Sequence, residues 1–347
     1  MTLAKRSPFF LRLLLLLVLH FTVFPLLANP PDLTNGGVPN SNLTINLGPT
    51  GMRGWVYHVN PGGNTSLSRQ IQVTAVDAGS PAASILAADD VILGANGTGA
   101  APVPFSSDAR RSLGLAIADA EARNPATLAL LRWRAGTTTT VQITLSHLGA
   151  YSATAPYQCP KSSQILQTGA QWVFANENSG RYSLGALTLL ATGNPAYLSR
   201  ARDEARALVP NATTRTQMMS DVRDASSQIT WSRGHTLILL CEYYLASGTS
   251  AATRDAQVLP GIEAFAVNIA KNSSLFGTVG HIYAEKNADG SPNGPMGGVY
   301  GPVNSAGMPC FLGLLLARKC GLTNPEIQPA INRASLFFSS YSGRGAI

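Results

Sequence analysis

The residues with the clearest potential for acid–base chemistry are two histidines and a glutamate in the C-terminal half. His235 and Glu242 lie seven positions apart in an apolar segment that predicts a helix, and this spacing places them on one helix face. His281 follows, two residues before Tyr283. Histidine and glutamate can act as general base and acid, while tyrosine positions a sugar or peptide. The alternative is a structural pair, satisfied by the backbone or by each other.

Other catalytic and metal-binding patterns are absent from the sequence. It contains no HExxH, no Walker loop, no G-x-S-x-G elbow and no aspartate-rich motif. The histidines and cysteines lack zinc-ligand spacing, so we expect no metal and no cofactor. The cysteines are Cys159, Cys241, Cys310 and Cys320. Free buried thiols and one disulfide both remain open for them.

The elements that would position His235 and Glu242 are helices. After Tyr157 the chain is rich in Ala, Leu and Gly and predicts three helical pairs, at 183–190 with 195–208, 235–246 with 258–271, and 305–320 with 325–341. Each pair joins an apolar helix to a more amphipathic one through a break that contains glycine. One pair cannot bury its own apolar face, so repeated pairs predict a solenoid or ring. The loop at 289–300 is too long for a plain connector and could line a binding surface.

The N-terminal half instead predicts strands around one helix. Residues 70–76 alternate polar and apolar side chains, which is typical of a half-buried strand. Further strands are expected at 54–59, 89–97, 128–133 and 140–145. Residues 106–123 predict an amphipathic helix with a serine cap, because Leu113, Ile117 and Ala120 fall on one face.

This succession of elements, over residues 42–148, resembles a PDZ domain. The most recognisable stretch runs from Val76 to Gly97 and reads V-x-A-G-S-P-A-A-x-x-L-x-x-x-D-V-I-L-G-x-N-G. The later L-L-R-W-R-A-G…V-Q-I-T-L is similar to the closing hairpin of that family. The resemblance implies binding of an extended peptide, which adds a strand to a sheet edge beside the helix.

The resemblance also implies a turn whose backbone N–H groups hold the peptide's terminal carboxylate. By position this turn is Gly51, Met52, Arg53, Gly54 and Trp55, followed by Val56. Arg53 departs from the family pattern, which has a hydrophobic residue there. It could reinforce carboxylate binding, or the groove could be closed and the domain a spacer. An ordinary tight turn, with Trp55 in the core, is the structural alternative.

The helical half is similar to the α/α toroid of terpenoid cyclases, prenyltransferase subunits and some polysaccharide lyases. This second resemblance rests on architecture and on phrases such as Gly-His-Thr-Leu at 234–237. The order of a PDZ-like domain followed by a toroid-like domain resembles that of a family of exported bacterial proteins with no assigned function. The residues show three pairs where a complete toroid has about six, so we expect an incomplete ring or a truncated product.

The first 28 residues predict a secretory signal peptide; the alternative is an uncleaved membrane anchor, which the short apolar run with His20 and Pro25 disfavours. Lys5, Arg6 and Arg12 flank the start of a leucine-rich run that ends in small residues before Asn29. Removing these three positive charges lowers the net charge from +7 to +4, which is too diffuse to indicate nucleic-acid binding. We expect export to a periplasmic or extracellular space, with membrane contact only through the leader.

These observations predict an α+β protein. We expect a leader at 1–28, a linker at 29–41, a small PDZ-like β-barrel or sandwich with capping helices at 42–150, a junction at 151–180, and an all-α domain of paired helices at 181–347. The leading hypothesis is a protein without catalysis that binds peptide or protein C-termini, its helical domain serving as scaffold or second binding surface. The alternative is a hydrolase or lyase that acts on a polysaccharide or peptide in the toroid cavity, with the PDZ-like domain recruiting substrate. A structural component of the cell envelope is a third reading.

Overall fold

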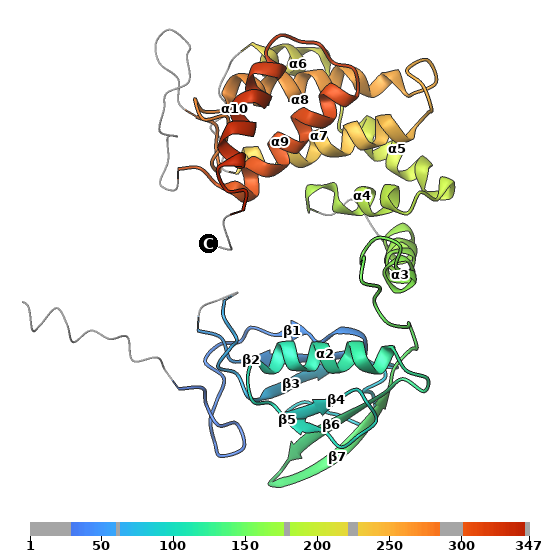
Figure 1. The fold of residues 1–347 in the computed structure, drawn as a ribbon, viewed down its shortest axis with the longest axis vertical. Coiled ribbons are helices and arrows are strands. Elements are labelled where there is room, and N and C mark those ends of the chain that lie inside the picture. The colour runs from blue at the N-terminus through green and yellow to red at the C-terminus, as the bar shows by residue number, and fades with distance from the viewer. Residues whose placement is uncertain (1–28, 60–62, 177–180, 221–227, 285–300, 344–347) are drawn as a thin grey trace, which may run out of the picture. The chain divides into compact units, whose positions relative to one another are not determined.

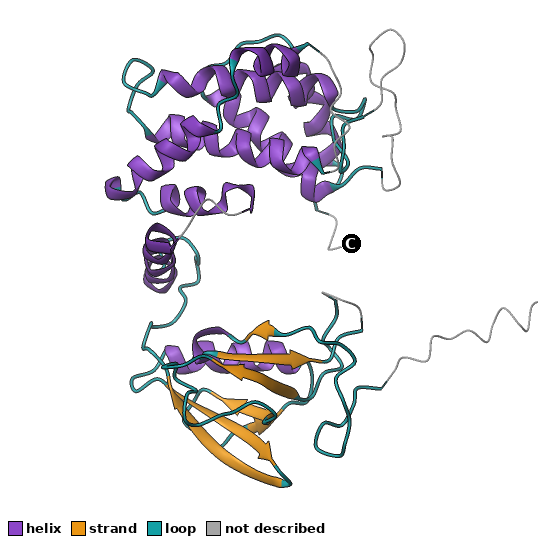
Figure 2. Cartoon of the chain, turned by 180° about the vertical axis from the view of Figure 1, so that it is seen from behind, coloured by secondary structure: helices purple, strands orange, loops and turns teal. Residues whose placement is uncertain are grey.

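A computed structural model describes residues 29–59, 63–176, 181–220, 228–284 and 301–343. The chain forms two compact units, Met1–Ser162 and Ser163–Ile347, which we call unit 1 and unit 2 (Figures 1 and 2). The predicted leader and the loop at 289–300 lie outside the described residues. Within the described ranges, no helix combines the length and the apolarity that crossing a membrane requires. Unit 1 is built on an antiparallel sheet and unit 2 on helices, which confirms the α+β class.

Unit 1 contains a seven-stranded antiparallel sheet with the order β1-β2-β3-β4-β6-β7, in which β5 also pairs with β4. Strands that are neighbours in this path are also consecutive along the chain, except that β5 and a helix lie between β4 and β6. The long hairpin β6–β7 closes at Ala135 and Gly136, both of which have a positive φ. The strands are β1 (Ile45–Asn46), β2 (Met52–Val56), β3 (Ile71–Val76), β4 (Val91–Asn96), β5 (Val103–Pro104), β6 (Thr127–Arg134) and β7 (Thr137–Thr144).

Helix α2 (Ala109–Glu121) covers one face of this sheet (Figure 1). Its N-cap is Asp108, whose side chain accepts the backbone N–H of Arg111 at 3.1 Å, so the predicted serine cap was wrong. The predicted apolar face, Leu113, Ile117 and Ala120, packs on the inner side chains of the sheet. This contact is the main core of unit 1.

The opposite face of the sheet carries a second, aromatic cluster. Trp55, Tyr57 and Val91 are buried there, and they pack with Leu33 from the segment predicted as a linker. The backbone N–H of Leu33 donates to the side-chain oxygen of Gln70 at 2.7 Å. The structure therefore differs from the predicted linker at 29–41, because an apolar side chain in this segment fixes it to the sheet.

Unit 2 contains the three predicted pairs, α4 with α5, α7 with α8, and α9 with α10. Helices α3 and α6 were not predicted, and α3 occupies most of the expected junction at 151–180. The elements are α3 (Pro160–Asn176, which starts at the end of unit 1), η2 (Arg181–Ser183), α4 (Leu184–Ala191), η3 (Pro195–Tyr197), α5 (Leu198–Ala207), α6 (Ala212–Met219), α7 (Ile229–Ala246), η4 (Ala256–Val258), α8 (Leu259–Asn272), α9 (Asn304–Lys319) and α10 (Ile327–Ser339).

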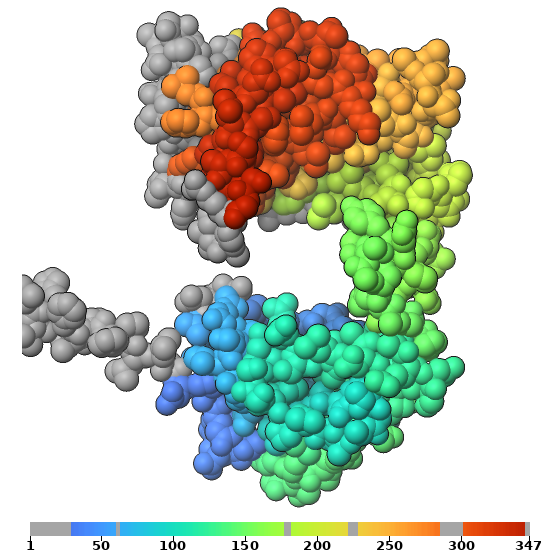
Figure 3. Space-filling view, in the orientation of Figure 1, coloured from blue at the N-terminus to red at the C-terminus, as the bar shows by residue number. Residues whose placement is uncertain are grey.

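Helices α7 and α9, the first helices of consecutive pairs, pack closely against each other. A Cβ atom at Gly234 would lie 2.8 Å from the backbone nitrogen of Cys310, and one at Gly313 would lie 2.9 Å from the Leu237 side chain. Since the contacts advance together along both helices, α7 and α9 run in the same direction. Helices α9 and α10 form one continuous surface on the face shown in Figure 3.

A similar side-chain hydrogen bond precedes the second helix of each pair: Asn194 and Asp255 cap η3 and η4, and Asn324 caps the turn just before α10. Asn194, Asp255 and Asn324 each accept, at 3.0–3.2 Å, the backbone N–H of the residue two positions later, namely Ala196, Gln257 and Glu326. Two of these caps also reach back to the preceding pair. Asp255 accepts from Arg206 on α5 at 2.8 Å, and Asn324 donates to Glu263 on α8 at 3.3 Å. Asp255 therefore both starts its helical segment and joins it to the preceding pair, and Asn324 makes a corresponding link just ahead of α10.

Candidate functional site

The predicted carboxylate-binding turn follows the short helix η1 (Gly48–Thr50) and enters strand β2. Gly51 has a φ of +75°, in the left-handed region, and a Cβ atom there would lie 2.0 Å from the Cβ of Ser80. Only glycine fits this position. The structure therefore explains the glycine by local geometry, before any ligand is considered.

The backbone N–H groups of this turn have internal partners. Gly48 donates to the Asn46 side chain at 2.8 Å and Gly51 donates to the carbonyl of Gly48 at 3.3 Å. Met52 donates to the hydroxyl of Thr50 at 3.1 Å. A peptide carboxylate would have to replace these hydrogen bonds, and breaking buried ones costs free energy.

Most side chains of the predicted site point into the protein. Met52 and Val56 are buried in the core beneath α2, whereas Trp55 lies in the aromatic cluster on the other face. Gly54 is packed against Leu47 and the backbone of Gln72. Arg53 alone is exposed, and its guanidinium lies 3.2 Å from the carboxylate of Asp77. The turn thus presents one partly neutralised cation to solvent.

The edge of β2 is occupied next to this turn. Strand β1 pairs with β2 at two positions, Ile45 with Gly54 and Asn46 with Arg53, while β3 pairs with its other edge. The β1 ladder does not extend to Val56. A peptide strand could add to this edge only beyond Gly54, or by displacing β1.

Beyond Gly54 a small recess opens between the β1–β2 hairpin and the first turn of α2. We call it the α2 recess; it encloses about 60 Å³ and is lined by Leu43, Ile45, Val56, His58, Gly63, Thr65 and Arg110. The Nδ1 of His58 lies 3.1 Å from the carbonyl of Val56, which can only accept, so Nδ1 carries a proton. The recess therefore combines apolar walls, an imidazole and an exposed guanidinium.

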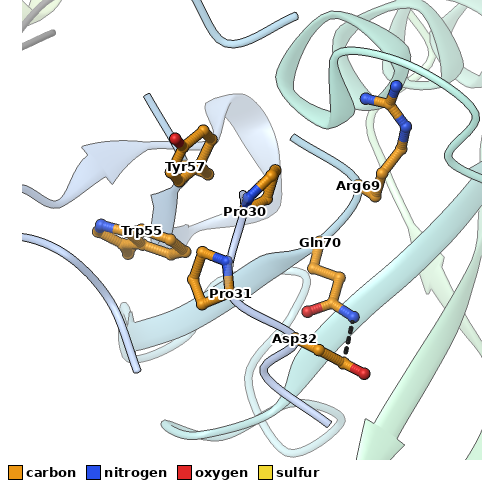
Figure 4. A pocket seen from close by; sticks show the side chains of 7 residues that line it. All are labelled: Pro30, Pro31, Asp32, Trp55, Tyr57, Arg69 and Gln70. Carbon is orange, nitrogen blue, oxygen red and sulfur yellow. Dashed lines mark hydrogen bonds between the residues drawn. The ribbon is translucent and has the colours of Figure 1, made fainter. Parts of the chain in front are cut away.

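A larger pocket of about 260 Å³ lies on the opposite face of the sheet, beside Trp55 and Tyr57 (Figure 4). Pro30 and Pro31 form another part of its wall, so the chain's own N-terminal segment already contributes to it. Asp32 accepts from the Gln70 side chain at 2.9 Å. This bond, followed by those from Thr34, lowers the pKa of Asp32. The pocket is aromatic and carries Arg69 at its rim; sequence reasoning did not identify it.

In unit 2 the structure brings His235 and His281 into one aromatic cluster with Tyr182 and Trp231. The ring of Tyr182 stacks on His235 with centroids 4.9 Å apart, and on Trp231 at 6.2 Å. The indole N–H of Trp231 donates to Nδ1 of His281 at 2.9 Å. Sequence reasoning missed Tyr182 and Trp231, although Trp231 precedes His235 by one helical turn.

Glu242 does not belong to this cluster. A spacing of seven residues separates it from His235 by about 10 Å along the α7 axis, and the Glu242 side chain is exposed. The Nδ1 of His235 lies 2.8 Å from the carbonyl of Trp231, as expected for a structural histidine. The two predicted acid–base residues therefore share a helix but not a site.

A recess of about 430 Å³ in unit 2 lies beside the cap residue Asp255. Burial would raise the pKa of Asp255, but hydrogen bonds from Arg206 and Tyr243 outweigh burial, so the pKa is lowered. Burial first, and then the bond to Asp255, raises the pKa of Tyr243. These groups hold one another, which makes the recess a structural seam between helical pairs.

The structure brings no three potential metal-ligating side chains together within the described ranges.

Among protein families, one described as a domain of unknown function, DUF6288, matches residues 162–347, more than half of the chain. No curated protein matches the chain, and no solved structure matches it either.

Proposed function

The chain belongs to the DUF6288 family, and we propose that this member is an exported protein that binds the C-terminal end of an extended peptide through unit 1. Unit 2 serves as a scaffold or second binding surface. The leader-like composition of residues 1–28 supports export.

The observation that carries this proposal is the α2 recess, where the part of β2 that β1 leaves unpaired lies next to the guanidinium of Arg110. Leu43, Ile45 and Val56 offer apolar walls for one small side chain. Arg110 at the mouth is an exposed guanidinium that suits a carboxylate. A terminal residue would place its side chain inward and its carboxylate against Arg110.

The strand pairing supports the same mode of binding. Because β1 pairs with β2 only at Arg53 and Gly54, an incoming peptide can continue the sheet along the rest of β2. The resemblance of residues 42–148 to a PDZ domain is consistent with a peptide held between a strand and a helix. The proposal differs from the PDZ pattern in one respect, since it places the peptide carboxylate at Arg110 and not at the glycine turn.

The test is a binding screen with the full chain from residue 29, using fluorescent peptides with free C-termini and their C-terminally amidated counterparts. We expect Arg110→Ala to weaken binding of a selected peptide roughly tenfold, because a charge-assisted hydrogen bond is lost. Amidation should have a similar effect. Arg111→Ala is the matched control, as Arg111 follows on the same exposed turn and does not line the recess.

Two outcomes would contradict this placement. Weakening by Arg53→Ala and not by Arg110→Ala would return the carboxylate to the glycine turn. Equal binding of free and amidated peptides by all variants would exclude recognition of the C-terminus by unit 1.

The aromatic cluster of unit 2 favours a second candidate, a hydrolase or lyase that acts on a polymer. Tyr182 and Trp231 offer ring faces on which a sugar can stack, next to His235 and His281 as proton carriers. If this candidate is right, His235→Ala and Tyr182→Ala should abolish turnover of a soluble polysaccharide. Glu242→Gln should leave turnover unchanged, because Glu242 lies outside the cluster.

A further inference from the structure

Two cysteines from different helical pairs meet at the contact between α7 and α9. Cys241 lies near the C-terminal end of α7, and Cys320 is the C-terminal cap of α9. Both are buried, with exposed fractions of 0% and 7%. The thiol of Cys320 lies 3.8 Å from the carbonyl oxygen of Cys241, within reach of a sulfur hydrogen bond. The parallel packing of α7 and α9 therefore places two thiols side by side.

The surroundings of the two thiols differ in a way that suits them to react with each other. A hydrogen bond from the Cys241 thiol, and then the positive charges of Arg254 and Lys319, lower the pKa of Cys320 against the opposing effects of burial and Glu242. Burial, and then the same hydrogen bond, raise the pKa of Cys241. Cys320 is thus the more readily ionised nucleophile, and Cys241 holds its proton until a second step.

The remaining cysteines do not share this arrangement. Cys310 is buried on α9 with its thiol directed at the carbonyl of Thr230, 3.4 Å away, and burial raises its pKa to about 12. Cys159 belongs to unit 1. Cys310 therefore provides a matched control on the same helix as Cys320.

We propose that Cys241 and Cys320 form a disulfide that joins the second and third helical pairs of unit 2. The inference stands independently of peptide binding and assigns the one pairing that the packing of α7 against α9 favours. It requires a disulfide oxidant, for which oxidised glutathione is the representative small molecule.

The reaction proceeds by thiol–disulfide exchange. The Cys320 thiolate attacks one sulfur of oxidised glutathione, and the released glutathione thiolate takes up the proton that Cys320 gave up. The Cys241 thiol then loses its proton and attacks the Cys320 sulfur, which releases the second glutathione as a thiolate that takes up the Cys241 proton. The glutathione S–S bond is exchanged for one protein S–S bond, and two electrons pass from the cysteines to glutathione.

The experiment equilibrates the full chain from residue 29 with reduced or oxidised glutathione and then blocks free thiols with N-ethylmaleimide in denaturant, because all four cysteines are buried in the folded protein. Reduced protein takes four labels, one for each cysteine, and we expect oxidised protein to take two. Tryptic digestion without reduction should yield one linked species that contains residues 234–254 and 320–333. The bond closes a loop between positions 79 residues apart, so oxidation should raise the melting temperature on the order of 10 °C.

Variants decide which sulfurs are involved. Cys320→Ser and Cys241→Ser should abolish both the label loss and the melting shift, whereas Cys310→Ser should keep both. Should a serine variant fail to fold, the linked tryptic species from the unaltered protein still identifies the pair. Four labels after oxidation, or a linkage that includes Cys310 or Cys159, would overturn the proposal.

Discussion

The two units bury polar groups in different ways. The buried ionised side chains described for unit 1 are paired, Asp90 with Arg134 and Glu121 with Lys161. In the described part of unit 2 the most deeply buried polar groups are neutral, such as Asn268, Asn272 and Thr278. The stability of unit 1 therefore depends on the pairing of its buried charges, whereas the stability of unit 2 depends on close packing of its helices.

The pair Lys161–Glu121 illustrates the first case. The Lys161 ammonium has no exposed surface and lies 2.7 Å from the Glu121 carboxylate, with the ring of Tyr151 4.5 Å away. Asp90 is buried as well, and burial would raise its pKa, but the hydrogen bonds from Arg134 outweigh this effect and lower it. A buried charge is tolerated only while its partner remains.

Unit 2 relies on neutral hydrogen bonds and small residues. The Asn268 amide donates to the carbonyl of Met218 at 2.8 Å and accepts the Tyr283 hydroxyl at 2.7 Å. Gly234 and Gly313 allow α7 and α9 to approach closely. Such an interior tolerates changes of pH but not added volume.

Removing the charge of Lys161 should have the largest effect. Lys161→Met leaves the Glu121 carboxylate buried without its cation, and we expect the free energy of unfolding to fall by about 3–5 kcal/mol. Urea denaturation at pH 7 measures the change. The double variant Lys161→Met/Glu121→Gln removes both charges and should recover most of the loss. If the double variant is as unstable as the single one, packing rather than charge explains the effect.

Adding one carbon atom to unit 2 should have the next largest effect. The Cβ atom of Gly234→Ala would press against the α9 backbone at Cys310, and we expect a loss of about 1–3 kcal/mol. Gly169→Ala in α3 is the control, because a Cβ atom there meets nothing within 4 Å and should stabilise the helix by about 0.5–1 kcal/mol. Equal effects of the two substitutions in thermal unfolding would refute the close-packing argument.

The smallest predicted effect is a pH dependence from Cys159 in unit 1. Hydrogen bonds, first from the Ser162 side chain and then from the backbone of Ser152, lower the pKa of this thiol from 9.0 to about 6. A group with a lowered pKa stabilises the fold fully above its unfolded value, and this stabilisation disappears as the pH falls through the folded value. Stability should therefore decline from about pH 9 to about pH 6.

The measurement is urea denaturation across this pH range for the protein and for Cys159→Ser. Serine does not ionise, so the variant should lose this part of the slope. Identical slopes for the two proteins would show that Cys159 does not carry the effect.

The sequence predicted most elements, because their periodicity is local. Strand β3 follows its alternating side chains, α2 follows Leu113 and Ile117, and the three helical pairs follow their apolar first helices. Helix α3 was missed because Trp172 and Phe174 are exposed on it, so that its residues lack a clear apolar face. The sequence did not predict that residues 29–41 pack on the sheet. Leu33 is the one buried apolar side chain described in this Pro/Gly-rich segment, and a single residue gives no periodic signal.

The candidate sites were less predictable, because they depend on contacts between distant segments. The hydroxyl of Thr50 and the amide of Asn46 occupy the N–H groups of the glycine turn, which no spacing of glycines reveals. Likewise, His281 joins His235 only through Trp231 and Tyr182. Residue spacing predicted that His235 and Glu242 share a helix. It could not show that His235 belongs to the aromatic cluster while Glu242 is exposed outside it.

The caps that link each helical pair to the preceding one have a thermodynamic consequence. Since Asp255 and Asn324 each hydrogen-bond a residue of the pair before their own, unit 2 resembles a row of nearest neighbours whose interfaces carry the cooperativity. Weakening one cap then costs more than a single hydrogen bond, because it lowers the probability that adjoining pairs order together. Hydrogen exchange would register this as protection that fades stepwise along the row, and not uniformly across it.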